Sequence, residues 1–251
     1  MSYIKPKRMT NSLLWLIIHW YSIKRVLKNK FKINNIKIYK FINWNLGRAY
    51  FTGYYNNQKV FIKIYSKFMV LKNELIFYSL FKNKLDLINV LDFFSNNKMQ
   101  VIIYEYVEGR HLSDNDIIKT PELLLEIFKI LLTINKDGFI HRDIRKENIL
   151  ITNKGLRIID FSFIINFNKN DNTFLDIAQN KKSLRLLKFL GDKLNPKDFE
   201  WNDFYSLNKI IDNLLSNNKI DATPLRKIKK YKILFENRIK NNTYQLQSCR
   251  E

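Results

Sequence analysis

The segment from Gly138 to Ile151, "GFIHRDIRKENILI", places a histidine, several cationic residues, two carboxylates and an asparagine between two apolar ends. A solvated helix face would space such charges with helical period, but here they crowd together before the sequence becomes strand-like. This pattern is typical of a catalytic loop held between two buried elements. It therefore predicts a chemical site.

The predicted secondary structure around this loop changes near residue 107, from mostly strands to mostly helices. The earlier stretches are rich in β-branched and aromatic residues with rough alternation, which predicts a mostly antiparallel sheet carrying an inserted helix. The expected strands are 36–42, 49–55, 59–65, 89–95 and 99–107, and the expected helices are 10–30 and 67–83.

The second half of the chain reads as mainly helical, after a boundary at 106–112. Residues 120–138 begin with Thr, Pro and Glu and end with Gly, residue types that favour the start and the end of a helix. Residues 148–152 and 156–160 flank an "NKG" turn and predict a short hairpin. Everything from about 171 onward is expected to be helical.

The composition bounds the class of protein. The chain has 251 residues, 46% of them apolar, so we expect one large domain or two lobes with a real core. Its single cysteine, Cys249, excludes an internal disulfide and favours a reducing compartment, the cytoplasm. The net charge of +21 favours an anionic partner, although a general enrichment in lysine would give the same excess.

The most apolar run near the N-terminus, Leu13 to Ile23, is too short for a spanning helix, which needs roughly 20 apolar residues. It predicts a helix packed on the domain, with an interfacial membrane anchor as the alternative. Two basic stretches, 24–32 and 225–232, are candidates for contact with an anionic surface.

The loop "HRDIRKEN" resembles the catalytic loop of the protein-kinase fold, in which an asparagine follows the aspartate Asp143 by five residues. Asp160 in "IIDFS" stands twelve residues after Asn148, where that fold has its metal-binding aspartate. Lys63 ends "VFIK" in the third strand, and Glu74 follows eleven residues later on the next helix. The order of these sites carries the resemblance, which covers roughly residues 45–165.

This resemblance implies a two-lobed α+β protein-kinase-like fold. The whole chain, residues 1–251, would be a single kinase-like domain, with a β-rich N-lobe at 1–106 that includes the N-terminal helix. A helical C-lobe would span 107–251.

The resemblance also implies a role for each site residue in the transfer of a phosphoryl group from ATP. Phosphoryl transfer mainly requires positioning and neutralisation of charge. Asp143 would be the catalytic base, and Asn148 and Asp160 would supply the hard oxygen ligands that Mg²⁺ prefers. Lys63 would hold the α- and β-phosphates, kept in place by an ion pair with Glu74.

Three further positions are implied in the same way. Arg145 would stabilise charge on the γ-phosphate. The backbone of the hinge, from Glu105 to Val107, would bond the adenine. Gly47 would belong to the loop that covers the phosphates. His141 is expected to pack under the catalytic loop as a structural residue.

The sequence departs from ordinary protein kinases in three places. Ala49 stands where the phosphate loop has its second glycine, and Thr52 or Gly53 would take the place of the third. Ser162 replaces the glycine of the metal-binding motif. No Ala-Pro-Glu motif follows Asp160, and its absence favours an acceptor that is not a protein.

A closer resemblance, from about Phe61 to Gly191, is to the bacterial lipopolysaccharide core heptose kinases. The similar parts are the hinge followed by "EGRHLSD", the compact "NKGLRIID" hairpin and a short helical tail that carries Asp176. This resemblance implies transfer of the γ-phosphate of ATP, with Mg²⁺, to a heptose hydroxyl of the lipopolysaccharide inner core. A cytoplasmic protein in peripheral contact with the anionic inner membrane surface is then expected, with no nucleic-acid partner.

Several alternatives stay open on the sequence. The chain could be a protein serine/threonine kinase, a phosphotransferase for small hydroxylated molecules, or a catalytically inactive kinase-like binding module. The interpretation as a nucleic-acid-binding protein is supported by the net charge alone. Either Asp176 or Asp203 could brace the catalytic loop from below, and the acceptor hydroxyl and the oligomeric state are not specified.

Overall fold

A computed structural model describes residues 4–39, 48–66, 72–82, 84–85, 87–97, 99–166 and 203–247. The chain divides into two compact units, one formed by 1–72 with 88–107 and the other by 73–87 with 108–251. None of the helices in the described ranges is both long enough and apolar enough to cross a membrane.

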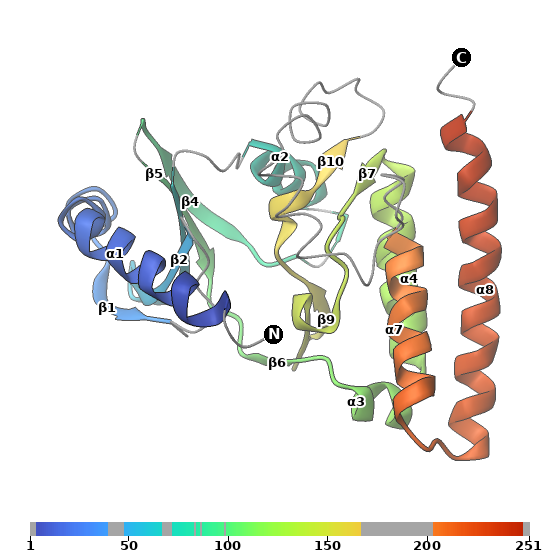
Figure 1. The fold of residues 1–251 in the computed structure, drawn as a ribbon. Helices are drawn as coiled ribbons and strands as arrows, with labels where there is room; N and C mark the ends of the chain where they lie inside the picture. The colour runs from blue at the N-terminus through green and yellow to red at the C-terminus, as the bar shows by residue number, and fades with distance from the viewer. Residues whose placement is uncertain are drawn as a thin grey trace. The chain divides into compact units, whose positions relative to one another are not determined.

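The N-terminal unit combines a long helix with a five-stranded antiparallel sheet (Figure 1), in the strand order β1-β2-β3-β5-β4. Its elements are the helix α1 (Ile4–Arg25), the π-helical turn η1 (Val26–Lys30), and the strands β1 (Asn34–Ile38), β2 (Arg48–Tyr55), β3 (Gln58–Ser66), β4 (Val90–Ser95) and β5 (Met99–Glu105).

The β2–β3 hairpin shows how the sequence sets this sheet. Asn56 and Asn57 make the turn with φ of 49° and 62°, a left-handed conformation that asparagine tolerates better than most residues. Gly53 lies within β2, opposite Val60 of β3. A Cβ atom at Gly53 would stand only 2.6 Å from Cγ2 of Ile33, so the glycine allows the segment before β1 to approach β2.

The core of this unit lies between α1 with its π-turn and one face of the sheet. Leu16, Ile23 and Leu27 are buried in one cluster with strand residues such as Phe51 and Ile62. The two strand residues are of the β-branched and aromatic types that pack well on a pleated surface. The predicted N-terminal helix is therefore found, and it packs on the sheet.

The second unit is mainly helical and carries short strands around the catalytic-loop segment. Its elements are α2 (Lys72–Phe81), β6 (Gly109–His111), α3 (Asp114–Lys119), α4 (Glu122–Lys136), β7 (Phe139–Ile140), the 3₁₀ turns η3 (Lys146–Asn148) and η4 (Phe161–Phe163), β8 (Ile149–Thr152), β9 (Gly155–Ile158), β10 (Ile165–Asn166), α7 (Asp203–Asn217) and α8 (Ala222–Gln247).

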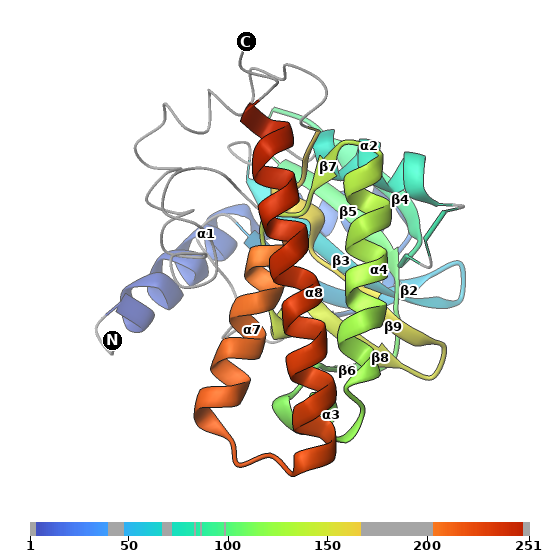
Figure 2. The same ribbon diagram turned by 90° about the vertical axis from the view of Figure 1, so that its right-hand side faces the viewer.

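The helices α4, α7 and α8 run side by side (Figure 2) and bury their apolar stripes against one another. The ring of Phe128 on α4 stacks on Phe235 of α8 at 4.7 Å and packs on Phe204 of α7 at 5.2 Å. All three rings are buried, so aromatic contacts link the three helices.

The structure contains the predicted helices and strands, with small differences in their bounds. The helix expected at 120–138 is preceded by a separate short helix, α3, and the hairpin β8–β9 has a third strand, β6. Neither α3 nor β6 was predicted. The helix expected at 10–30 begins earlier, at Ile4, and ends in a π-turn. The strand expected at 36–42 is found as β1, which begins at Asn34 and ends at Ile38, and residues 40–42 lie outside the described residues.

Candidate active site

The catalytic-loop segment lies in the second unit, between β7 and the turn η3. His141, Arg142, Asp143 and Asn148 are all buried, at 0% to 5% exposure. Buried polar groups must be hydrogen-bonded to avoid a large desolvation cost. The bonds that satisfy these groups therefore define the shape of the loop.

Asp203, at the start of α7, holds the loop from within the unit. Its two carboxylate oxygens accept the backbone N–H of His141 at 2.7 Å and of Arg142 at 2.9 Å. Arg142 has φ of 66°, a costly conformation for a residue with a long side chain. The paired hydrogen bonds stabilise that turn, which leads directly into Asp143.

Burial dominates the electrostatics of this brace. It raises the pKa of the Asp203 carboxyl to about 6, while the N–H groups of His141 and Arg142 and the charge of Arg142 act in the opposite direction. Burial also lowers the pKa of the Arg142 guanidinium to about 10. Of the two candidates for the brace, Asp203 has these contacts, and Asp176 lies outside the described residues.

His141 is engaged through both ring nitrogens. Its Nδ1 accepts the backbone N–H of Asp143 at 3.2 Å, and its Nε2 lies 3.1 Å from the carbonyl oxygen of Ile159. This pattern corresponds to a neutral imidazole that carries its proton on Nε2. The ring therefore links the catalytic loop to the residue before Asp160, which agrees with the structural role expected for it.

The carboxylate of Asp143 is oriented from two sides. The side-chain amide of Asn148 donates to Asp143 Oδ2 at 2.8 Å and to its backbone carbonyl at 2.9 Å. Arg145 Nε lies 3.5 Å from Asp143 Oδ1. Because the amide nitrogen of Asn148 is used in this way, its amide oxygen is the atom suited to ligate a cation.

Asp160 follows β9 and has a left-handed backbone, with φ of 62°. The hydroxyl of Ser162 donates to Asp160 Oδ1 and lies 3.5 Å from Oε2 of Glu74. The serine that replaces the expected glycine thus contacts both the predicted metal ligand and the buried glutamate on α2. This contact could not be predicted from the departure in sequence alone.

An aromatic cluster positions Asp160 and Glu74 within the second unit. Phe161 stacks on Phe77 of α2 at 4.2 Å, and the ring of His141 lies 4.6 Å from it. Glu74 precedes Phe77 by less than one helical turn. Packing of α2 on Phe161 therefore orders the loop that carries Asp160 together with the helix that carries Glu74.

A separate set of polar contacts fixes the segment after the hinge. Ser113 caps α3 in a reciprocal capping box with Asp116, which also pairs with Arg110 of β6. The Arg110 hydrogen bond is the largest influence that holds the pKa of Asp116 well below its usual range. Lys146 of the catalytic loop bonds Asp114 at 2.7 Å and so ties the loop to α3.

Four residues predicted to bind the nucleotide belong to the N-terminal unit. Lys63 is buried at 4% exposure on β3, in register with Ile102 of β5. The side chain of Glu105 accepts the backbone and side-chain N–H groups of Asn89. The backbone N–H groups of Glu105 and Tyr106 donate to carbonyl oxygens of neighbouring segments, and adenine binding by the hinge backbone stays a prediction. Val107 follows β5, and Gly47 lies outside the described residues.

The ion pair between Lys63 and Glu74 joins residues of the two units and stays a prediction. The suggestion that Gly53 serves the phosphate loop is not favoured, because Gly53 sits in the middle of β2, where its missing side chain makes room for Ile33.

The donor set fits a hard divalent cation of the Mg²⁺ type. An amide oxygen from Asn148 and a carboxylate from Asp160 would hold it, and Mg²⁺ characteristically uses one or two carboxylates with waters and substrate phosphates for the rest. No group of three His, Cys, Asp or Glu side chains gathers anywhere in the part of the chain that the structure describes. A site of this type does not need one.

The chain matches the protein kinase domain over residues 56–185, just over half of its length. It therefore belongs to the protein kinase domain family. The prediction of a protein-kinase-like α+β fold is confirmed by this match, and the predicted enzyme class, a kinase, agrees with it.

Similar proteins include a probable serine/threonine-protein kinase of Clostridium perfringens, 36% identical over 30% of this chain and 12% of the relative. Serine/threonine-protein kinase 1 of African swine fever virus is 26% identical over 48% of this chain and 43% of the viral protein. A solved structure, the Cydia pomonella granulovirus kinase PK-1, has a TM-score of 0.44 and 18% identity, over 58% of this chain and 59% of that one.

The chain thus spans less than half the length of these two curated relatives. Both relatives are named as serine/threonine kinases. The finer resemblance to lipopolysaccharide heptose kinases receives no support from these similarities and stays a prediction.

Proposed function

We propose that this chain is an ATP- and Mg²⁺-dependent phosphotransferase that acts on a hydroxyl group, with a serine or threonine side chain of a protein as the acceptor. The observation that carries the proposal is the held carboxylate of Asp143, oriented by Asn148 and Arg145 on a loop braced by Asp203. Membership of the protein kinase domain family supports the chemistry, and the names of the relatives support a protein acceptor.

The residues of the loop suit this reaction. The acceptor hydroxyl would bond to Asp143, which takes its proton as the oxygen attacks the γ-phosphorus and the bond to the ADP oxygen breaks. Arg145, beside that carboxylate, would stabilise charge on the γ-phosphate. Mg²⁺, held by Asn148 and Asp160, would neutralise phosphate charge when bound.

The second candidate acceptor is a heptose hydroxyl of the lipopolysaccharide inner core. The absence of an Ala-Pro-Glu motif after Asp160 favours it, since that region forms the peptide platform in protein kinases. With this acceptor, a cytoplasmic location and peripheral contact with the anionic inner membrane surface are part of the proposal. The net charge of +21 supports contact with such an anionic surface.

The test is transfer of labelled γ-phosphate in the presence of Mg²⁺ to a generic protein substrate and, separately, to lipopolysaccharide lacking core phosphate. Asp143→Ala should lower transfer by roughly a hundredfold or more, since general-base catalysis contributes about 10²–10⁴-fold. Asp137→Ala is the matched control, because it removes an exposed carboxylate of the same unit that pairs with Lys84.

The acceptor that takes up label decides between the two candidates. Label in protein supports the first, and label in the glycolipid alone supports the second. ADP release with the label recovered as inorganic phosphate would show transfer to water, and the same assay with added small hydroxylated molecules would then test them as acceptors. ATP binding without ADP release would overturn the enzymatic proposal in favour of an inactive binding module.

A further inference from the structure

The outward face of α1 is apolar over two turns. The face that packs on the sheet is buried through Leu16 and Ile23. The opposite face exposes five large side chains, namely Leu13 at 44%, Leu14 at 56%, Ile17 at 64%, Ile18 at 65% and Tyr21 at 77%. A helix in water normally turns a polar face outward, so a contiguous apolar ridge of this kind marks an interaction surface.

Basic residues follow the apolar ridge on the same face of α1. Leu14, Ile18, Tyr21 and Arg25 follow the spacing i, i+4, i+7, i+11 and therefore lie on one stripe. Lys24 stands beside this stripe, and both it and Arg25 are exposed. The outer surface of α1 thus changes from apolar to cationic within three turns.

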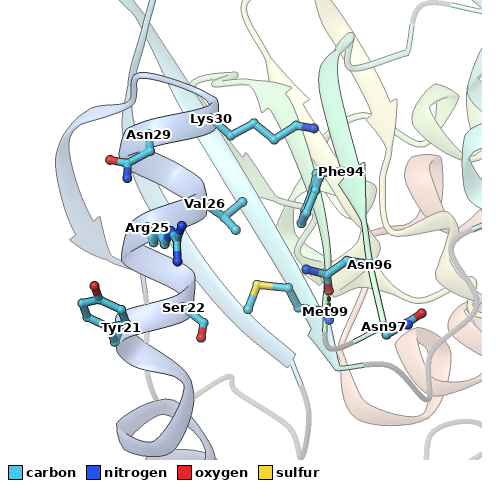
Figure 3. Close-up of a pocket in the computed structure, with 10 residues that line it drawn as sticks. All are labelled: Tyr21, Ser22, Arg25, Val26, Asn29, Lys30, Phe94, Asn96, Asn97 and Met99. Atoms are coloured by element: carbon cyan, nitrogen blue, oxygen red, sulfur yellow. Dashed lines mark hydrogen bonds between the residues drawn. The ribbon is translucent and has the colours of Figure 1, made fainter.

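The cationic end of the stripe borders a pocket of about 510 Å³ (Figure 3). The π-turn η1 and the end of α1 form one wall, and the β4–β5 hairpin forms the other. Arg25 and Lys30 contribute cations, Asn29 and Asn97 contribute amides, and Phe94 lies opposite Lys30. None of the described residues that line the pocket is acidic.

The β4–β5 wall of this pocket contacts the Lys30 ammonium. Lys30 Nζ lies 4.4 Å from the ring centroid of Phe94, a cation–π contact that directs the ammonium across the pocket. The side chain of Asn96 accepts the backbone N–H of Met99 at 2.8 Å and fixes the hairpin turn. Single π-helical turns occur frequently at functional sites, and here the π-turn supplies Asn29 and Lys30.

We propose that α1 and this pocket together bind an anionic phospholipid at a bilayer surface, with the headgroup phosphate in the pocket and the apolar ridge among the acyl chains. Charge complementarity identifies the occupant, because Arg25 and Lys30 face no acidic residue among the described residues that line the pocket. The adjoining ridge explains why the phosphate is carried by a lipid, since a soluble phosphate compound would leave five exposed apolar side chains unexplained.

The test is sedimentation of the full chain with phosphatidylcholine vesicles that contain, or lack, about one-third phosphatidylglycerol, because anionic lipid attracts basic residues near the surface. No ATP is added, so the result is independent of the proposed kinase activity. We expect at least roughly tenfold stronger partitioning to the anionic vesicles, since two cations each strengthen binding about fivefold.

Two double variants separate the parts of the site. Arg25→Glu with Lys30→Glu should reduce binding to the level of neutral vesicles. Ile17→Asn with Ile18→Asn should weaken binding at unchanged charge. All four side chains are exposed, so the thermal melting of these variants should match the parent.

The matched control is Lys129→Glu with Lys136→Glu, which makes the same change of net charge at exposed positions on α4, outside both basic stretches. It should bind like the parent. Trp20, 37% exposed beside the ridge, provides a direct probe of insertion. Lipids brominated in their acyl chains should quench the parent more than the Trp20→Phe variant.

Four outcomes would overturn the proposal. These are equal binding to both kinds of vesicle, unchanged binding of the Arg25 and Lys30 variant, equal loss in the α4 control, and equal quenching with and without Trp20. Saturable binding of soluble glycerophosphate that removes the chain from vesicles would assign the pocket to a soluble ligand. Binding of RNA that depends on Arg25 and Lys30, without vesicle binding, would equally exclude the bilayer.

Discussion

In the N-terminal unit, the interior between α1 and the sheet is built from apolar side chains, whereas in the second unit the loop 141–148 is buried with its charged side chains. Phe51 and Ile62 are fully buried and need no polar partner. Asp143 and Arg142 are buried as well, but Asp143 accepts a hydrogen bond from Asn148 of the same loop and the backbone of Arg142 donates one to Asp203 of α7.

The two kinds of interior respond differently to mutation. Apolar packing is non-directional and distributes its stabilisation over many contacts. A buried polar network is directional, and removing one member leaves its partners unsatisfied at full desolvation cost. We therefore expect larger and more local effects in the catalytic loop than in the sheet.

The largest effect is expected for Asp203→Ala. The backbone N–H groups of His141 and Arg142 lose their acceptors while buried, so we expect a loss of about 3 kcal/mol in the free energy of unfolding of this unit. Amide hydrogen exchange at these two residues should accelerate, as measured by NMR. Asp212→Ala on the same helix removes a half-buried carboxylate and should leave that exchange unchanged.

The contribution of Asp203 should also depend on pH. Its folded pKa of about 6 lies above its usual value of 3.8, so folding favours the protonated form. The stability it contributes is present below that usual value and is lost as pH rises through 6. Relative to Asp203→Asn, the free energy of unfolding should fall by about 2 kcal/mol between about pH 4.5 and 6.5. Parallel curves for the two proteins in urea denaturation would refute this.

In the N-terminal unit, Gly53→Ala tests how sensitive the apolar packing is to an added methyl group. The added methyl would meet Ile33 Cγ2 at 2.6 Å and the carbonyl oxygen of Asn34 at 3.0 Å, so we expect a loss of about 1–2 kcal/mol. Thermal denaturation measures the loss. In a double-mutant cycle, Ile33→Ala should recover part of it, and strictly additive losses would show that the clash with Ile33 is not the cause.

The smallest effect is expected for Lys146→Ala. Lys146 and Asp114 are about one-third exposed, and ion pairs of this kind contribute under about 1 kcal/mol. The loss should shrink further in high salt, as followed by chemical denaturation. A loss as large as that of Asp203→Ala would mean that the tie to α3, rather than the buried brace, holds the loop.

Local sequence patterns predicted most of the helices and strands. Alternation in "KVFIKIY" and "MQVIIYEYV", and the Asn-Asn turn before Gln58, specified the hairpins of the sheet because strand period and turn chemistry are local properties. The order of Lys63, Glu74, Asp143, Asn148 and Asp160 likewise indicated the family, which the match to the protein kinase domain confirmed.

Tertiary structure alone decided which partners hold these residues. The contact between Asp203 and the loop spans 61 residues, and the contact between Ser162 and Glu74 spans 88, so no local pattern could identify them. The role of Gly53 could not be predicted locally either, because it depends on the approach of Ile33. The sequence of α1 has apolar residues on two faces, so it does not show which face packs on the sheet and which is exposed. Period and propensity act over a few neighbouring residues, whereas burial depends on which distant segments fill the remaining space.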